Sequence, residues 1–285
     1  INGRRAKPET KLTLGDQVRV PPVSGLTQPA RAPSAMYQRT AARLAQRLVV
    51  VYADDGLLVL DKPAGVAVHG GSGVASGAIE QLRALHPQAR FLELVHRLDR
   101  DTSGLLMVAR RRSVLRTLHE ALRLRRVRKQ YLAVVAGQLP TRSRTIREPL
   151  SRTLTVDGER RVRVDAQGQA AVTHVRGLGS GTLPGVGSVS LVGIRLETGR
   201  THQIRVHMAS IGHPLIGDVK YGDFGLNRLA NERGHGRLFL HAAELSFEHP
   251  QSGERLTVAA PLPEAFAGLL AQAGIASPVA GGADS

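Results

Sequence analysis

The chain has 285 residues, with 39 Lys and Arg against 23 Asp and Glu, and a formal net charge of +16 at pH 7. It contains no cysteine, which excludes disulfide bonds, thiol catalysis and a Cys-ligated metal site. No apolar run reaches the ~20 residues that cross a bilayer, so a transmembrane helix is excluded as well. A chain of this length buries a core, and its charge favours a polyanionic partner, with nucleic acid ahead of an anionic membrane surface. The alternative explanation is GC-rich codon usage, because Arg outnumbers Lys 34 to 5.

The two ends of the chain differ in composition from its middle. Residues 1–24 are basic, and Gly15-Asp16 predicts a turn between two strand-like flanks. Residues 25–47 mix Pro, Ala, Ser, Gln and Arg and are predicted to be a linker. Residues 276–285 are small and polar, and we expect them to be disordered. The main domain is therefore predicted at residues 48–275.

Within this main domain, strand-like runs outnumber helices. Residues 49–52 and 57–60 flank Asp54-Asp55-Gly56 and predict a hairpin. Apolar residues at helical spacing predict helices near residues 79–85, near residues 114–122 with Ser113 as N-cap, and at residues 266–270, ending at Gly274. Further strands are predicted at residues 131–136, 161–164, 188–196, 204–208, 238–245 and 255–259. Helices and strands do not alternate strictly, which favours an α+β fold whose mixed, largely antiparallel sheet is flanked by helices and loops.

Several catalytic signatures are missing from the sequence. It has no GxxxxGK[ST] phosphate loop, no GxGxxG after a strand, no GxSxG elbow and no HExxH pair. His202 and His207 stand five apart on a predicted strand and would point to opposite faces. We therefore expect no metal site.

Polar residues are concentrated in the segment Val95–Leu106. Asp99 and Asp101 stand among two arginines and a histidine, directly before an apolar run. Arginine neighbours keep a carboxylate ionised, and an ionised carboxylate screened from water can act as a nucleophile or base. A surface cluster of ion pairs explains the same pattern, and the pattern alone does not choose between Asp99 and Asp101.

A second polar segment covers residues 197–207. Alternation along a predicted strand places Gln203, Arg205 and His207 on one face. If that face is partly buried, Arg205 needs an acidic partner or a phosphate, so it is a candidate partner for the first segment's carboxylate. A solvent-facing arginine is the alternative. Aromatic residues are scarce, and Tyr131 is either a strand-core tyrosine or a stacking surface for an extruded base.

Five motifs occur together and in order in residues 48–272. They are DKPAGVAVHGG (61–71), HRLDRDTSGLL (96–106), KQYLA (129–133), TGRTHQIRVH (198–207) and RLFLHAAELSFEHP (237–250). This set resembles the motifs of the RluA-type family of RNA pseudouridine synthases, most closely its RluC branch. The resemblance implies the pseudouridine synthase fold, isomerisation of uridine to pseudouridine in RNA, and no metal or organic cofactor.

The motif match also implies roles for individual residues. Asp99 would be the catalytic carboxylate, Arg205 would pair with it, Tyr131 would stack on the target base, and Leu240 would form an apolar wall. Arg97 would enter the space left by the flipped base. Further phosphate contacts are expected from Lys62, Arg200 and the cluster Arg123, Arg125, Arg126 and Arg128, for which a solvated helix face is the alternative.

The branch resemblance carries further expectations. Residues 1–24 would be the C-terminal remnant of an alpha-L RNA-binding domain, whose beginning precedes Ile1. The substrate would be large-subunit (23S) ribosomal RNA, modified at several positions by a monomer in the cytoplasm. Two other hypotheses are a non-catalytic RNA-binding protein on the same scaffold and a metal-independent nuclease that uses His and Asp.

Overall fold

The computed structural model describes residues 13–17, 48–70, 76–155 and 159–278. The chain divides into two compact units, Ile1–Arg39 and Thr40–Ser285. In the first unit the predicted turn is confirmed, since the Asp16 amide donates to the Thr13 carbonyl over 3.1 Å and Gly15 takes a φ of 101°. Most of the predicted RNA-binding remnant (1–24), the whole linker (25–47) and most of the tail (276–285) lie outside the described residues.

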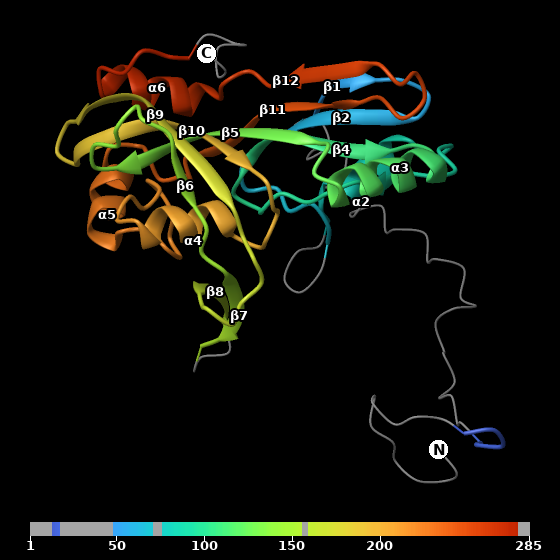
Figure 1. Cartoon of the computed structure of the whole chain (residues 1–285). Coiled ribbons are helices and arrows are strands. Elements are labelled where there is room, and N and C mark those ends of the chain that lie inside the picture. Colours follow the sequence, from blue (N-terminus) through green and yellow to red (C-terminus); the bar gives the residue numbers. More distant parts are fainter. Residues whose placement is uncertain (1–12, 18–47, 71–75, 156–158, 279–285) are drawn as a thin grey trace. The chain divides into compact units, whose positions relative to one another are not determined.

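The second unit is built on one large sheet (Figure 1). Its strands in chain order are β1 (Val49–Ala53), β2 (Leu57–Lys62), β3 (Glu93–Leu94), β4 (Ser103–Ala109), β5 (Arg128–Ala136), β6 (Arg144–Ile146), β9 (Thr173–Leu183), β10 (Gly187–Leu196), β11 (Leu240–Glu248) and β12 (Arg255–Ala259). They are ordered β1-β2-β4-β11-β5-β10-β9-β6, with β12 on β11 and β3 on β4. Among the described strand pairs only β4–β11 is parallel. The predicted mixed, largely antiparallel sheet is confirmed.

Helices cover both faces of this sheet. They are α2 (Ala78–Leu85), α3 (Arg112–Arg123), α4 (Gln203–Ser210), α5 (Phe224–Glu232) and α6 (Glu264–Gln272). Successive side chains of a strand point to opposite faces, so Leu58 and Leu60 of β2 pack in a cluster with α2 and α4, whereas Leu57 and Val59 pack in another with α3. In Figure 1, α6 and α4 lie on opposite sides of the sheet. No helix in the described part of the chain is long and apolar enough to cross a membrane.

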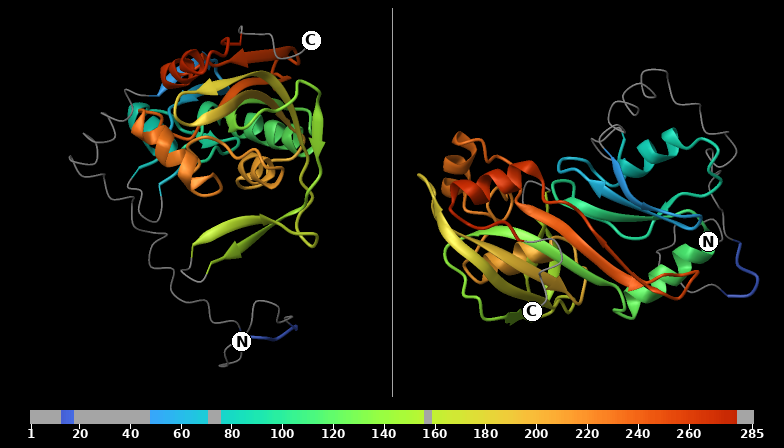
Figure 2. Two further views of the ribbon diagram at one scale, coloured as in Figure 1. Left: turned by 90° about the vertical axis from the view of Figure 1, so that its left-hand side faces the viewer. Right: turned by 90° about the horizontal axis from the view of Figure 1, so that it is seen from above.

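A separate hairpin leaves the sheet between β6 and β9. Its strands β7 (Leu150–Leu154) and β8 (Arg160–Val164) pair only with one another among the described strands. Figure 1 and the left view of Figure 2 both show the hairpin extending away from the body of the unit. The predicted strand at 161–164 is confirmed as part of β8 in this hairpin, and a turn at Asp165–Gly168 follows it.

Two local predictions are wrong. The segment 204–208 is not a strand but part of helix α4, and residues Gln203 through Met208 are all buried. Because polar and apolar side chains of α4 are buried alike, their alternation does not mark an exposed face. Ser113 is not an N-cap, since α3 begins at Arg112 after Arg111, which makes no side-chain cap hydrogen bond. The predicted hairpin at 49–60, the other helices and the other strands are confirmed.

Candidate active site

The loop between β3 and β4 carries Asp99. Leu98 is buried beside it, and the Thr102 amide donates to the Asp99 carbonyl over 3.2 Å. Just beyond, Gly104 has a φ of 104°, and a Cβ there would lie 2.2 Å from the carbonyl oxygen of Ala242. Only glycine allows β4 and β11 to approach so closely. The close packing of β4 on β11 therefore fixes the position at which the Asp99 loop joins β4. The Asp99 side chain itself is 18% exposed.

Helix α4 brings Arg205 to this carboxylate. Arg205 Nη1 lies 3.3 Å from Asp99 Oδ2, across 106 positions of sequence. The guanidinium also donates to both oxygens of Asp218, from Nε to Oδ2 over 2.7 Å and from Nη2 to Oδ1 over 2.8 Å. Such a bidentate pair fixes the guanidinium plane, so Asp218 sets the direction in which Arg205 meets Asp99.

Burial and pairing act against one another in this pair. Burial opposes ionisation of Asp218, but the hydrogen bonds and charge of Arg205 outweigh it and lower the pKa of Asp218. Burial likewise opposes the charge on Arg205, whereas Asp218 and then Asp99 raise the pKa of its guanidinium. Both groups are therefore charged at neutral pH, which a buried pair tolerates only when it is well hydrogen-bonded.

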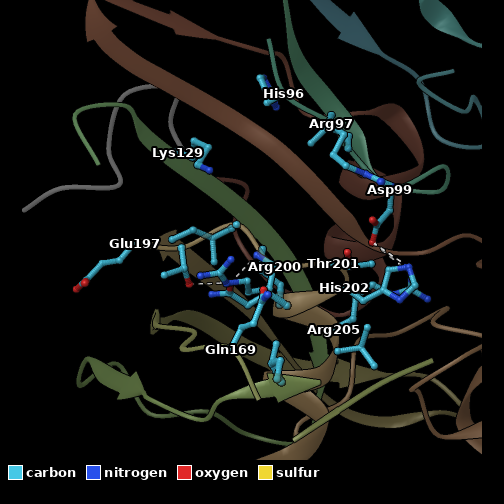
Figure 3. Close-up of a pocket in the computed structure, with 18 of the residues that line it drawn as sticks. His96, Arg97, Asp99, Lys129, Gln169, Glu197, Arg200, Thr201, His202 and Arg205 are labelled. Carbon is cyan, nitrogen blue, oxygen red and sulfur yellow. Dashed lines mark hydrogen bonds and ion pairs between the residues drawn. The ribbon is translucent and has the colours of Figure 1, made fainter. Parts of the chain in front are cut away.

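His202 and Tyr221 complete the surroundings of Asp99. His202 directly precedes α4 with a φ of 52°, and its Nε2 lies 3.8 Å from Asp99 Oδ2. The Tyr221 hydroxyl lies 2.8 Å from His202 Nδ1, and the Arg205 guanidinium stands 5.1 Å from the centre of the Tyr221 ring. Figure 3 shows Asp99 and His202 pointing toward one another at one side of a pocket.

The pocket has a volume of about 940 Å³, within the range of small-molecule sites. Its walls come from the Asp99 loop, from β5 and β11 through Tyr131 and Leu240, and from the hairpin β7–β8. Seven cationic side chains line it: Arg97, Arg123, Arg125, Lys129, Arg152, Arg200 and Arg205. Their acidic counterparts on the wall are Asp99 and Glu197. The pocket thus surrounds two carboxylates with seven cationic side chains, and such an excess of positive charge suits an anionic substrate.

Comparison with known proteins accounts for this arrangement. Residues 56–210 match the family model described as RNA pseudouridylate synthase. The chain is 49% identical to the ribosomal large subunit pseudouridine synthase C of Escherichia coli K12 over 93% of this chain and 81% of that protein. The enzyme of the same name from Haemophilus influenzae is 48% identical over 90% of this chain and 77% of that one. The chain belongs to the RNA pseudouridine synthase family.

Solved structures agree with this assignment. The human RNA pseudouridylate synthase domain containing 4 superposes on the synthase with a TM-score of 0.66 at 28% identity, covering 86% of this chain and 99% of that one. The human domain containing 1 superposes with a TM-score of 0.64 at 30% identity, covering 77% and 85%. The family predicted from the five motifs, and its fold, are therefore confirmed.

The structure brings most of the predicted site residues of the synthase together. Six of them line the pocket described above: Asp99, Tyr131, Arg205, Arg97, Arg200 and Leu240. Asp101, which the residue pattern left as an equal candidate, is half exposed beside Arg100 and lies outside the pocket lining. Arg123 and Arg125 of the basic cluster also line the pocket, each with an acidic neighbour, Glu120 and Glu197 respectively.

Lys62 does not occupy the place expected for a phosphate contact. Its side chain is fully buried, and its Nζ donates to the carbonyls of Pro63, Val66 and Arg100 over 3.0, 2.8 and 3.0 Å. Burial lowers the pKa of Lys62 to about 7, against the opposing charges of Asp101 and Asp99. The ammonium group has no exposed surface to offer RNA, and instead ties the loop after β2 to the loop that carries Asp99.

Lys62→Met is expected to destabilise the synthase and to leave its phosphate contacts unchanged. Three carbonyls would lose the donor that Lys62 supplies, and among the described residues only the Arg100 carbonyl would keep another one, the Gly65 amide. The expected cost is about 1–3 kcal/mol in the free energy of unfolding. Urea denaturation measures that cost. RNA affinity against salt concentration provides the second readout, and a shallower salt dependence in Lys62→Met would contradict the structural assignment.

Two residues of the site, Asp218 and Tyr221, were not identified from the sequence, and neither was the contact of His202 with Asp99. Asp218 follows the apolar Leu215-Ile216 after a single glycine, and Tyr221 comes three residues later. A carboxylate placed at the end of a buried apolar run was the available signal for Asp218. His202 was considered only as a metal ligand, and the described residues hold no cluster of three or more side chains suited to a metal ion. His207, with which it was paired, is bound to Thr173 and the Glu148 carbonyl.

Proposed function

We propose that this chain converts uridine to pseudouridine at several positions of large-subunit ribosomal RNA, with Asp99 as the catalytic carboxylate. One observation carries the proposal: Asp99 lies in the basic pocket of a pseudouridine synthase fold, paired with a buried arginine. The choice of RNA is supported by the name of the bacterial relatives. The motif resemblance supports modification at more than one position of that RNA.

The reaction rearranges bonds without net oxidation. The bond between N1 of uracil and C1′ of the ribose breaks, the base turns, and a bond from C5 to C1′ forms while C5 loses a proton and N1 gains one. Asp99 would act on the uridine as nucleophile or base. The hydrogen bond from Arg205 and the shortest approach of His202 both fall on Oδ2, which would leave Oδ1 to face the substrate.

The neighbours of Asp99 take supporting roles in this proposal. Arg205 orients the carboxylate and keeps it charged. Tyr131 would stack on the uracil, and Leu240 would close the apolar side of the pocket. Burial, reinforced by the charge of Asp99, raises the pKa of Tyr131, so its phenol stays protonated in the free enzyme. That favours stacking over base catalysis by Tyr131 in the resting state.

The remaining cations of the pocket would hold RNA. A uridine must leave its stack to reach Asp99, at a cost of about a few kcal/mol. Arg97 is exposed at the pocket, where it can enter the space that the base leaves, and Arg200 is exposed at the same pocket. Arg152 of the hairpin β7–β8 lies beside it and donates to Thr201 over 2.8 Å. These side chains would offset the unstacking through phosphate contacts.

The affinity of the chain for RNA is expected to fall steeply as salt rises. Each phosphate contact with a single strand contributes about −0.7 to the slope of log K against log salt. Arg200→Gln and Arg152→Gln should each make the slope shallower by about that amount. Arg255→Gln is the matched control, because Arg255 is exposed on β12 and outside the pocket. Equal slopes for all three variants would argue against RNA binding at this pocket.

The function itself is tested by incubating the protein with unmodified large-subunit ribosomal RNA. Carbodiimide treatment followed by primer extension maps each pseudouridine as a stop. New stops would establish the activity and the modified positions. A folded protein that binds this RNA and creates no stops would favour the non-catalytic RNA-binding alternative, and chain scission would indicate the nuclease.

The motif resemblance supports further parts of the proposal. Residues 1–24 remain proposed as the end of an alpha-L RNA-binding domain, residues 25–47 as a linker and residues 48–275 as the catalytic domain. We also keep the proposals of a monomer, of catalysis without a cofactor and of a cytoplasmic location. Size-exclusion chromatography with light scattering measures the molar mass in solution and so tests the proposed monomer.

A further inference from the structure

His202 approaches the catalytic carboxylate on the same oxygen as Arg205. Arg205 Nη1 lies 3.3 Å from Asp99 Oδ2, and His202 Nε2 lies 3.8 Å from that oxygen. The histidine side chain is 19% exposed and lies among the residues that line the pocket. What His202 contributes depends on whether Nε2 carries the proton, since only then can it donate toward Asp99.

A chain of hydrogen bonds decides which nitrogen is protonated. The backbone amide of Val162, in strand β8, donates to the Tyr221 hydroxyl oxygen over 3.0 Å. The hydroxyl in turn lies 2.8 Å from His202 Nδ1. Because the oxygen already accepts from Val162, its own proton is free to point at Nδ1. Nδ1 is then the acceptor, and the imidazole proton resides on Nε2.

The opposite end of the imidazole selects the same form. A negative carboxylate beyond Nε2 favours a proton there, whereas the Arg205 guanidinium, 5.1 Å from the Tyr221 ring, opposes a second positive charge nearby. Burial lowers the pKa of His202, and the charge of Asp99 only partly opposes this. Lys220 acts in the same direction as burial and Arg205, and Asp218 in the same direction as Asp99. Burial and the two cations outweigh the two carboxylates, which leaves a neutral imidazole with its proton toward Asp99.

The backbone at His202 is held in an unfavourable conformation. Its φ of 52° and ψ of 20° are left-handed, which few non-glycine residues adopt. Such strain persists only where the surroundings impose it, and it clusters at functional sites. Here the strained residue is the N-cap that directly precedes α4, and Arg205 follows it by three positions, less than one full turn of helix. One backbone feature therefore aims both side chains that meet Asp99.

We propose that His202 is a positioning residue for Asp99, held as the neutral Nε2–H tautomer by Tyr221 and, through it, by the hairpin β7–β8. This inference rests on the proposed function, because it treats Asp99 as the catalytic carboxylate. His202 and Arg205 together confine Oδ2 and leave Oδ1 for the uridine. The hairpin carries Arg152 on the pocket wall, so the surface proposed to hold RNA also supports the hydrogen-bond chain behind Asp99.

Two substitutions of His202 separate this role from a structural one. His202→Gln can place an amide donor where Nε2 stands, whereas His202→Asn can place one only where Nδ1 stands. Asparagine tolerates the left-handed backbone, so a defect in His202→Asn is not due to backbone strain. We expect the kcat of His202→Gln to stay within about threefold of the wild-type value. The kcat of His202→Asn should fall about 10–100-fold, which is the scale of the loss when a catalytic group is misplaced. RNA affinity should be unchanged in both.

His119→Gln is the matched control, since His119 is exposed on α3 and outside the pocket. An equal loss of kcat in the Gln and Asn variants would overturn the inference. So would a loss that appears only in KM, because that would assign His202 to RNA binding. Tyr221→Phe is expected to lower kcat in the same direction as His202→Asn, with the double variant no worse than either.

Nitrogen-15 NMR of the imidazole provides a test that does not depend on activity. In histidine-labelled protein, the signals absent from His202→Asn identify His202, and its long-range proton correlations report which nitrogen is protonated. We expect Nε2–H in the wild type at neutral pH, and exchange between the tautomers in Tyr221→Phe. A proton on Nδ1, or on both nitrogens, would overturn the inference by itself. A wild-type protein that converts no uridine would instead overturn the proposed function.

Discussion

Asp99→Asn is expected to abolish pseudouridine formation while leaving RNA binding and the fold in place. Asparagine matches the shape of aspartate but lacks the charge and the nucleophilic oxygen of a carboxylate. The loss of rate should be on the order of 10⁴-fold or more, as when other enzymes lose a nucleophile. Arg205 keeps its bidentate contact with Asp218 in this variant, so its charge stays compensated.

The measurement is primer extension on carbodiimide-treated large-subunit ribosomal RNA, beside a binding assay with the same RNA. Asp101→Asn is the matched control, because Asp101 has the same chemistry two residues away and lies outside the pocket lining. Stops from the wild type and Asp101→Asn alone would support the assignment. Stops from Asp99→Asn as well would remove Asp99 as the catalytic residue.

The pairing of Arg205 with a carboxylate of the segment Val95–Leu106 was predictable from the residues, although the helix that carries Arg205 was not. The choice of Asp99 over Asp101 came from the motif resemblance. The prediction rested on energetics, since a partly buried arginine needs an anionic partner whatever element carries it. The strand assignment rested on alternation, which helix α4 imitates because its polar side chains are buried and satisfied. Gln203 and His207 both bond to Thr173. Because these polar side chains find hydrogen-bond partners far away in the sequence, they can be buried on a helix. Their alternation with apolar residues then resembles that of an amphipathic strand.

The contrast between Lys62 and Arg200 shows what charge alone does not predict. Both were expected at phosphates, yet Lys62 is enclosed by three carbonyls and Arg200 is exposed at the pocket. A lysine at the end of a buried strand can turn inward when nearby carbonyls accept its hydrogen bonds. Two of the acceptors are local, but the third is the carbonyl of Arg100, 38 residues away, and no local pattern predicts that contact.

Asp218→Asn is expected to destabilise the protein more than any surface substitution and to reduce its activity as well. Asp218 is 1% exposed and Arg205 is 7% exposed, so the variant leaves a buried guanidinium with only Asp99 as an acidic partner. Removing one member of a buried pair costs about 3–5 kcal/mol in the free energy of unfolding. Arg205 would also lose the contact that fixes its plane, and Asp99 would lose its orientation.

Urea denaturation of both proteins at a series of pH values measures this cost and its origin. The pKa of Asp218 is lower in the folded state than in the unfolded chain, so its stabilising contribution is present above its unfolded pKa of about 3.9. It is lost as the pH falls through the folded pKa. The difference between wild type and Asp218→Asn should therefore be constant from pH 7 to about pH 5 and shrink in more acidic solution.

Asp55→Asn is the matched control for this experiment. Asp55 is 87% exposed and pairs with Arg111 over 3.4 Å, and exposed pairs of this kind contribute little to stability. If Asp218→Asn were no less stable than Asp55→Asn, Arg205 would have to be satisfied by Asp99 alone. The bidentate contact would then orient Arg205 without stabilising the fold, and a loss of kcat in Asp218→Asn at full stability would identify that case.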